Sequence, residues 1–244
     1  MFIHFSQDSI RVTCEFKNYD NLWGNTYTCI VKNTKISTDV RVSEFVGKHE
    51  ADKTNADVTT LYMSGEDLSV LPSGIMEIFP NLTGLRVECT TLEKLDRKIF
   101  KKLKTLTHVS LDNNKIETIP QNAFCDLISL EWLSVGGNKI KLVDKEAFKS
   151  LIKLNYLSLH RNQLEVLDSD VLKYNTEMKQ LFLSQNKLKT ISSDLILPLK
   201  KLSMIQLHLN PCINDDLSRD ATINDVITYL NLNSVKQTSV NSKK

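Results

Sequence analysis

Residues 106–119 read LTHVSLDNNKIETI, and this stretch decides the fold. It follows the pattern L-x-x-L-x-L-x-x-N-x-L, which recurs, with apolar substitutes for leucine, at intervals of 24 residues. The pattern starts at Val58, Leu82, Leu106, Leu130, Leu154, Met178 and Leu202. Because six equal intervals without an insertion do not arise by chance, the chain is predicted to consist of repeated structural units.

The spacing within a unit predicts a short strand and a return across the core. In the unit that starts at Leu154, Leu157 and Leu159 alternate with other residues, which is typical of a strand with one buried face. Later apolar positions, such as Leu164, bring the chain back. No unit can bury its leucines without a neighbour, so the units are predicted to stack into an α/β solenoid with a curved parallel β-sheet.

The residue at position nine of each unit is predicted to have a structural role and not to bind a ligand. An asparagine amide can both donate to and accept from backbone groups at a bend. The series breaks at its first two members, so the first two turns are expected to be less regular. Position nine holds Glu66, Thr90, Asn114, Asn138, Asn162, Asn186 and Asn210.

Residues 58–212, seven 24-residue units of which the last is partial, resemble the leucine-rich repeat family of the extracellular type. The stretch from Ile119 to Ile140, IPQNAFCDLISLEWLSVGGNKI, is close to the family consensus. The resemblance implies a horseshoe with a concave parallel sheet that binds a protein or glycan ligand.

Residues 1–57 are predicted to form an N-terminal capping region with a β-hairpin. Ile10–Phe16 (IRVTCEF) and Thr26–Lys32 (TYTCIVK) both alternate and both have a cysteine at the centre. A disulfide between Cys14 and Cys29 would close a loop of 15 residues and stabilise the protein by about 3 kcal/mol. The alternative is a pair of buried thiols.

The same N-terminal segment resembles secreted leucine-rich repeat proteins of insects, among them mosquito immune proteins. The similarity lies in the hairpin cysteines, in Val46–His49 (VGKH) and in Asn55–Leu61 (NADVTTL). It implies a secreted recognition protein of innate immunity, although this chain has no heptads after the solenoid. The run Thr38–Phe45 (TDVRVSEF) predicts one more strand before the repeats.

The localisation is predicted to be extracellular, with the signal peptide absent from the sequence as it stands. Met1–Phe5 is too short for a signal-peptide core of about 7 to 15 apolar residues. No stretch approaches the roughly 18 apolar residues of a membrane span.

Residues 213–233 are predicted to form a C-terminal helical cap, and the polar residues 234–244 are predicted to be disordered. Thr222 and Asp225 are typical of a helix start, and four apolar residues share one helical stripe. Asn210-Pro211-Cys212 resembles the start of the family's cysteine cap, but no cysteine follows it.

Three cysteines lie outside the predicted disulfide. Cys212 is predicted to be a buried thiol, and Cys125 is placed on the convex side. Cys89 is either a free thiol or a bridge to another chain, which leaves a homo- or heterodimer open.

The concave face should present positions two, three, five, seven and eight of each unit. Position three includes His108, Trp132 and Tyr156, whose rings are predicted to stack because neighbouring strands lie about 4.8 Å apart. Aromatic residues and arginine are enriched at binding hot spots, although rings can also simply stabilise a sheet. The predicted ligand-binding residues are Tyr62, Arg86, His108, Trp132, Tyr156, His160, Arg161 and Phe182.

Charge argues against a nucleic-acid partner. The formal net charge is only +2, and on the concave positions Arg86, Arg161 and Lys179 balance Glu88, Asp112 and Glu131. Lysines gather elsewhere and are predicted to form a solvated convex surface, with a glycosaminoglycan site as the alternative. These are Lys98, Lys101, Lys102, Lys104, Lys141, Lys145, Lys149 and Lys153.

No enzyme, metal site or cofactor is predicted. Glu88 and Asp112 should be neighbours, but an open sheet offers no apolar pocket to raise the pKa of either carboxyl. His160 and His208 lie two strands apart, about 9.6 Å, which is too far to share a zinc ion.

The chain is therefore predicted to be a non-catalytic recognition protein. The alternative is a structural or adhesion ectodomain, or a self-associating extracellular scaffold. Asn81-Leu82-Thr83 matches the glycosylation sequon, which makes Asn81 a candidate for modification.

Overall fold

The computed structural model describes residues 9–21, 23–32, 35–36, 40–65, 68–95, 97–213 and 222–231. Its strands are β1 (Ser9–Thr13), β2 (Glu15–Asn21), β3 (Gly24–Lys32), β4 (Arg41–Val46), β5 (Thr60–Ser64), β6 (Gly84–Glu88), β7 (His108–Ser110), β8 (Thr118–Ile119), β9 (Trp132–Ser134), β10 (Leu142–Val143), β11 (Tyr156–Ser158), β12 (Gln180–Phe182) and β13 (Met204–Gln206). The short helices are η1 (Asn55–Asp57), α1 (Ile75–Ile78) and η2 (Ser193–Leu195), and residues 223–231 are also helical.

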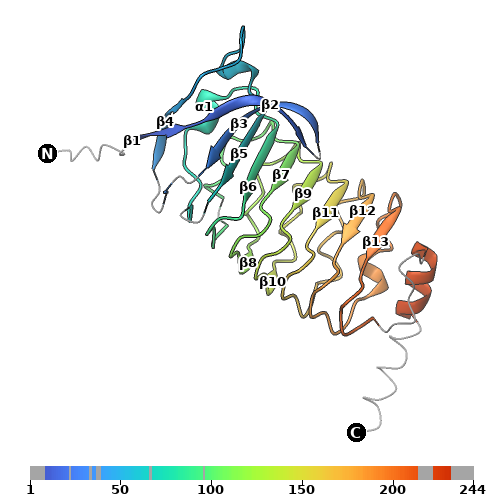
Figure 1. Ribbon diagram of the computed structural model, residues 1–244. Helices are drawn as coiled ribbons and strands as arrows, with labels where there is room; N and C mark the ends of the chain where they lie inside the picture. The colour runs from blue at the N-terminus through green and yellow to red at the C-terminus, as the bar shows by residue number, and fades with distance from the viewer. Residues whose placement is uncertain are drawn as a thin grey trace, which may run out of the picture.

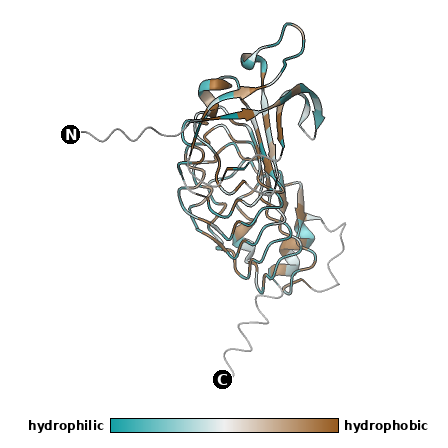
Figure 2. Cartoon of the chain, turned by 60° about the vertical axis from the view of Figure 1, so that its left-hand side comes forward, coloured by the Kyte–Doolittle hydropathy of each residue, from teal (hydrophilic) through white to brown (hydrophobic). Residues whose placement is uncertain are grey.

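One nine-stranded sheet runs the length of the molecule in the order β13-β12-β11-β9-β7-β6-β5-β3-β2 (Figure 1). Each strand from β5 to β13 in this sheet comes from one 24-residue unit and pairs in parallel with its neighbour. Viewed nearly along the stack, the turns of successive units overlie one another (Figure 2). The predicted α/β solenoid with a parallel sheet is confirmed.

The core consists of apolar columns that continue from unit to unit. Leu130, Leu133 and Val135, at positions one, four and six of one unit, are fully buried, as their counterparts in neighbouring units are. On the return side, the ring of Phe124 lies 5.4 Å from that of Phe100 and 6.2 Å from that of Phe148. Because every column crosses unit boundaries, each unit depends on its neighbours for burial.

The position-nine asparagines form a hydrogen-bonded ladder that joins successive units. Asn162 is buried, and its Nδ2 donates to the carbonyl oxygens of Val135 and Leu159 at 3.0 Å each. Its Oδ1 accepts from the backbone N–H of Ile140 in the preceding unit at 3.0 Å. Asn138, Asn186 and Asn210 repeat these contacts.

The second irregular member of that series, Thr90, is accommodated by the next asparagine, Asn114. Thr90 is buried, and its backbone N–H and hydroxyl both donate to Oδ1 of Asn114. Glu66, the other irregular member, lies outside the described residues.

The N-terminal strands differ from the prediction in how they are divided. The predicted strand Ile10–Phe16 is wrong as one strand, because the chain changes sheets at Cys14: β1 pairs in parallel with β4, and β2 pairs antiparallel with β3. The N–H of Cys14 donates to the carbonyl oxygen of Val46 at 2.8 Å. A Cβ on Gly47 would lie 2.0 Å from the Cys14 carbonyl oxygen, so only glycine allows this approach. The strand expected from Thr38 begins at Arg41.

Cys14 and Cys29 form a disulfide, with their Cα atoms 5.6 Å apart. The two cysteines do not lie opposite each other in the hairpin, because the residue opposite Cys29 in the β2–β3 register is Phe16. The bridge therefore ties β3, in the large sheet, to the point where the chain leaves β1.

The helical residues 223–231 begin at a capping box. The N–H of Thr222 donates to Oδ2 of Asp225 at 2.9 Å, and the N–H of Asp225 donates to Oγ1 of Thr222 at 3.2 Å. Val226 and Leu230 are buried in the core. The predicted disordered tail, 234–244, lies outside the described residues, and the boundaries of the other three predicted regions, 1–57, 58–212 and 213–233, remain predictions.

Candidate ligand-binding face

Four aromatic rings form a continuous row across the concave face: Trp23, Trp132, Tyr156 and Phe182, here called the aromatic row. Trp132 and Tyr156 occupy the same register position on β9 and β11, and their rings stack 4.6 Å apart at 14°. Phe182 on β12 follows, with its ring 5.0 Å from that of Tyr156. Trp23 contacts Trp132 edge to face at 5.5 Å.

The predicted stack of three rings is wrong at its first member. His108 does not stack on Trp132; its ring lies 5.2 Å from that of Trp23 instead. Burial lowers the pKa of His108. Trp23, which sequence reasoning missed, thus separates the two rings that were expected to touch.

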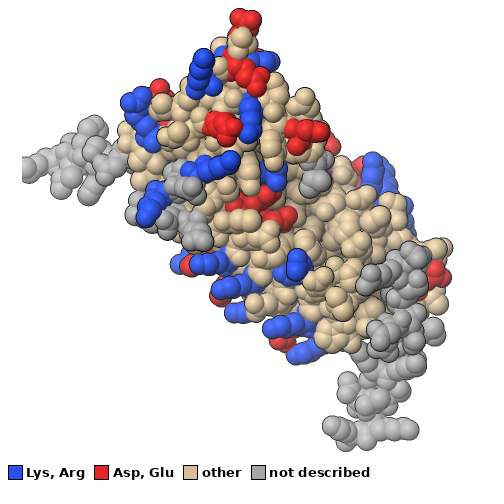
Figure 3. Space-filling view, in the orientation of Figure 1, with Lys and Arg blue, Asp and Glu red and all other residues tan. Residues whose placement is uncertain are grey.

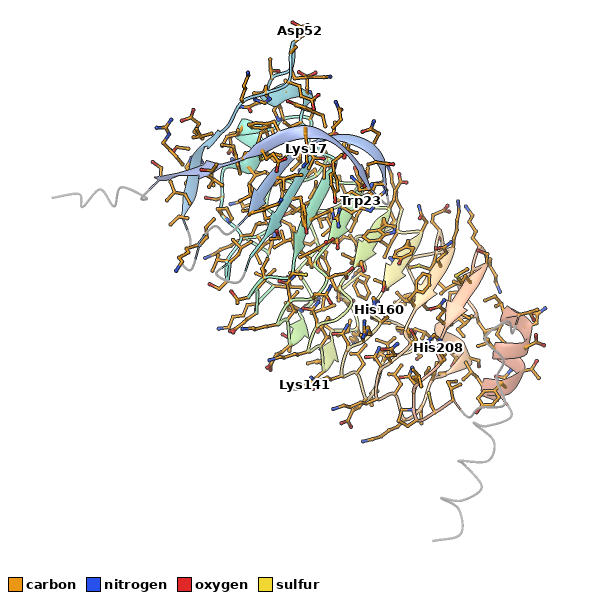
Figure 4. All side chains as sticks on the ribbon, in the orientation of Figure 1. Lys17, Trp23, Asp52, Lys141, His160 and His208 are labelled. Atoms are coloured by element: carbon orange, nitrogen blue, oxygen red, sulfur yellow. A yellow bond between two sulfur atoms is a disulfide. The ribbon has the colours of Figure 1, made fainter. Side chains whose placement is uncertain are left out.

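Trp23 reaches this position from the turn between β2 and β3, which leans over the sheet (Figure 4). The side chain of Asn21 holds the turn, because its Oδ1 accepts from the N–H of Trp23 at 2.8 Å. A Cβ on Gly84 would lie 2.9 Å from Cζ3 of Trp23. Gly84 is position three of the second unit. A glycine at this strand position was therefore the signal in the sequence that another side chain packs over β6.

The rings of Trp132 and Tyr156 stand upright on the sheet. The 4.6 Å separation of Trp132 and Tyr156 matches the spacing of neighbouring strands, about 4.8 Å, so the rings stack along the direction that joins the strands. Their planes are therefore close to perpendicular to the sheet, and each covers a face of the other. These two rings therefore offer mainly their edges to a ligand.

A second group of side chains lies on β5 and β6 and just after β7 and β11. It consists of Tyr62, Arg86, Glu88, Asp112 and His160 and is here called the polar row. Arg86 donates to both oxygens of Glu88, at 2.9 and 2.8 Å, and its guanidinium lies 4.6 Å from the Tyr62 ring centroid. In Figure 3 acidic side chains form a patch near the middle of this view, whereas the region of β9 to β12 has few charged groups.

The expectation that an open sheet would not raise the pKa of its carboxyl groups is wrong for Asp112. Burial raises the pKa of Asp112, and the negative charge of Glu88 adds to the effect, although hydrogen bonds oppose it. Its Oδ1 accepts from the hydroxyl of Ser134 and from the N–H of Gly136, both at 2.6 Å. The sheet is locally closed at this point, because another side chain folds over Gly136.

That side chain is His160. A Cβ on Gly136 would lie 2.3 Å from Cε1 of the His160 ring, so the ring occupies the space that any other residue would fill. Burial lowers the pKa of His160, and its Nδ1 shares a hydrogen bond with the Ser158 hydroxyl at 2.8 Å. Figure 4 shows His208 further along, over the later units.

The remaining predicted residues lie outside the two rows. Arg161 is exposed, with φ 54°, at the corner after β11. Asn81 is exposed, and its Nδ2 donates to the carbonyl oxygen of Ala56 at 2.9 Å, so its glycosylation remains a prediction. Cys89 is exposed, whereas Cys125 and Cys212 are partly buried, and burial raises the pKa of Cys212 to about 11.

The stacked 24-residue units and the open face of their parallel sheet define a solenoid repeat protein. The family profile described as "Leucine rich repeat" matches residues 80–140, 128–175 and 152–211, which together make up more than half of the chain. The chain belongs to the leucine-rich repeat family.

Among solved structures, a chain from the crystal structure of the TLR13–ssRNA13 complex has the same fold, with a TM-score of 0.57 and 19% sequence identity. The match covers 68% of this chain and 25% of that chain, so this chain spans about a quarter of its structural neighbour. No curated protein matches the sequence. None of the described helices is long and apolar enough to cross a membrane.

Proposed function

We propose that this chain is a secreted, non-catalytic recognition protein of innate immunity whose concave face binds a protein ligand. The observation that carries the proposal is the aromatic row: four adjoining rings, each partly exposed, lie on an open sheet. Partly exposed tryptophan and tyrosine are the side chains that most often anchor protein interfaces.

The orientation of the rings favours a protein over a glycan. Sugars and nucleobases bind aromatic side chains by stacking on ring faces. One face of Trp132 and one face of Tyr156 are covered by the stack between them, and Trp23 and Phe182 adjoin the outer sides of this pair, so its edges are the most accessible part. Ring edges pack well against apolar side chains, and the neighbouring polar row supplies hydrogen-bonding groups of the kind found at an interface rim.

The charges on the face favour the same choice. Arg86 is neutralised by its bidentate pair with Glu88, and Asp112 lies close by, so the polar row has no excess of positive charge. A phosphate backbone is held chiefly by lysine and arginine. We therefore propose that the ligand is not a nucleic acid, even though the structural neighbour comes from a complex with ssRNA13.

The proposed location is supported by the disulfide between Cys14 and Cys29, because such bonds persist mainly in oxidising compartments such as the extracellular space. The resemblance of the N-terminal segment to secreted insect proteins supports the link with immunity.

The experiment compares the wild-type protein with Trp132→Ala/Tyr156→Ala by affinity capture from native extracellular fluid and by glycan-array binding. We expect the wild type to retain a defined protein that the variant loses, with at least about a tenfold weaker affinity for the purified ligand.

Leu142→Ala/Val166→Ala is the matched control, since it removes two exposed apolar side chains, 61% and 66% accessible, away from the aromatic row. Retention of the ligand by the aromatic variant would show that another face binds it. Glycan binding that depends on Trp132 would overturn the choice of a protein ligand.

A further inference from the structure

A cavity of about 840 Å³ lies outside the concave face, between the segments that follow β5 and β6. One wall comes from residues 69–77 and the other from residues 93–103, with Arg41 at the edge. Its size is that of a typical small-molecule site. None of its lining residues belongs to the aromatic row or the polar row.

The cavity has an excess of positive charge. Five lining side chains are cationic: Arg41, Lys94, Lys98, Lys101 and Lys102. The acidic lining residues are Glu77 and Glu93. Like charges gathered around a hollow surface raise the local concentration of ions of opposite sign.

The acidic groups do not neutralise this excess. Arg41 and Lys102 converge on the same atom, Oε1 of Glu77, with their nitrogens at 3.9 and 3.4 Å. Within the described part of the chain, Lys94 and Lys101 have no acidic partner within ion-pair distance, and both are exposed. These two ammonium groups are therefore available to a ligand.

The cavity also has an apolar floor. Leu71, Pro72 and Leu103 are buried beneath it, and Met76 is partly buried. A ligand that fits both features has several anionic groups on a frame with C–H surface. A sugar chain with sulfate groups has this chemistry.

We propose that this cavity binds a sulfated oligosaccharide. The choice of sulfate over phosphate rests on the proposed extracellular location, where sulfated glycans are the abundant polyanions. The site is distinct from the concave face, so a protein ligand and a sulfated glycan could be bound together.

The test is calorimetric titration with a heparin-derived hexasaccharide at physiological ionic strength, where charges more than about 8 Å apart are largely screened. We expect Lys94→Gln/Lys101→Gln to weaken binding about tenfold or more. The control Lys187→Gln/Lys200→Gln removes two exposed lysines elsewhere on the solenoid and should change the affinity less than about twofold.

Equal losses in the two lysine variants would overturn the proposal, because they would show binding by overall charge. Absence of hexasaccharide binding, or tighter binding of inositol hexakisphosphate, would overturn the sulfated sugar as ligand. The variant Trp132→Ala/Tyr156→Ala should bind the hexasaccharide like the wild type, so failure of the concave-face proposal can be told apart from failure of this one.

Discussion

The repeats from Leu106 to Asn210 and the N-terminal strands β1 to β4 complete the same core by different means. In the repeats, one asparagine per unit satisfies the buried backbone groups of two turns, and the contacts recur unit after unit. In the N-terminal strands nothing recurs: β3 pairs with β5 in the sheet, and one disulfide and one tryptophan add contacts that occur only there. Contacts that recur in every unit therefore spread the stabilisation along the whole solenoid, whereas contacts that occur once place it in one small region.

The largest effect is expected from breaking the ladder in the repeats. Asn162→Ala leaves the N–H of Ile140 and the carbonyl oxygens of Val135 and Leu159 without this partner. The free energy of unfolding should fall by about 4 kcal/mol, because each buried group that loses its hydrogen bond costs about 1–3 kcal/mol. Urea denaturation measures this, with Gln163→Ala as the neighbouring control. A loss below 1 kcal/mol would contradict the ladder's proposed role.

Breaking the disulfide tests the other region. Cys14→Ala/Cys29→Ala opens a loop of 15 residues and should reduce the free energy of unfolding by about 3 kcal/mol. Cys125→Ala, at a partly buried cysteine outside the disulfide, is the control. Hydrogen exchange should show the loss of protection concentrated in β2 and β3, and uniform loss over β9 to β13 would count against a local role of the bridge.

Trp23→Ala removes the aromatic contact between the hairpin and the repeats. A loss of about 2 kcal/mol is expected from the apolar area and ring contacts together. The chain has two tryptophans, and because Trp23 and Trp132 lie 5.5 Å apart, their coupled transitions should give a circular dichroism couplet in the wild type. The couplet should vanish in Trp23→Ala and in Trp132→Ala and persist in Tyr156→Ala.

Asp112→Asn should have the smallest effect. It tests a contact that occurs once within the repeats, because Asp112 is a buried carboxyl in one unit and not a residue that recurs. Burial raises the folded-state pKa of Asp112 above its ordinary value of 3.8, so the folded protein binds the proton more tightly than the unfolded chain. The stability contributed by this group is therefore present at low pH and is lost as the pH rises through the folded pKa.

The asparagine variant should accordingly be more stable than the wild type at pH 7, and the difference should shrink toward pH 3. Asp194→Asn, at an exposed position, is the control for removal of one carboxylate. A difference that grows on acidification would contradict the assigned direction of the pKa shift.

The features that the sequence predicted are those that repeat in every unit. The strands that begin at His108, Trp132 and Tyr156 follow from the spacing of leucines, because the same burial requirement repeats in every unit. The stack of Trp132 on Tyr156 follows as well, since residues at one position of neighbouring units must lie one strand apart.

What the sequence did not predict depends on contacts between segments of unrelated pattern. Trp23 lies in a short turn with no periodicity, and its place over Gly84 depends on how far the hairpin leans over the sheet. Asp112 occupies an ordinary exposed register position, and its burial arises because Gly136 leaves space for the ring of His160 from the next unit.

The antiparallel direction of β2 also restricts how this array can change by repeat duplication. A 24-residue unit pairs in parallel on both sides, and β2 offers no such edge at the N-terminal end of the sheet. A unit inserted between β5 and β9 would carry Trp132 about 4.8 Å further from the hairpin and separate it from Trp23. A unit inserted after β9 would leave that contact intact. Homologues of different length should therefore gain and lose their units in the C-terminal half.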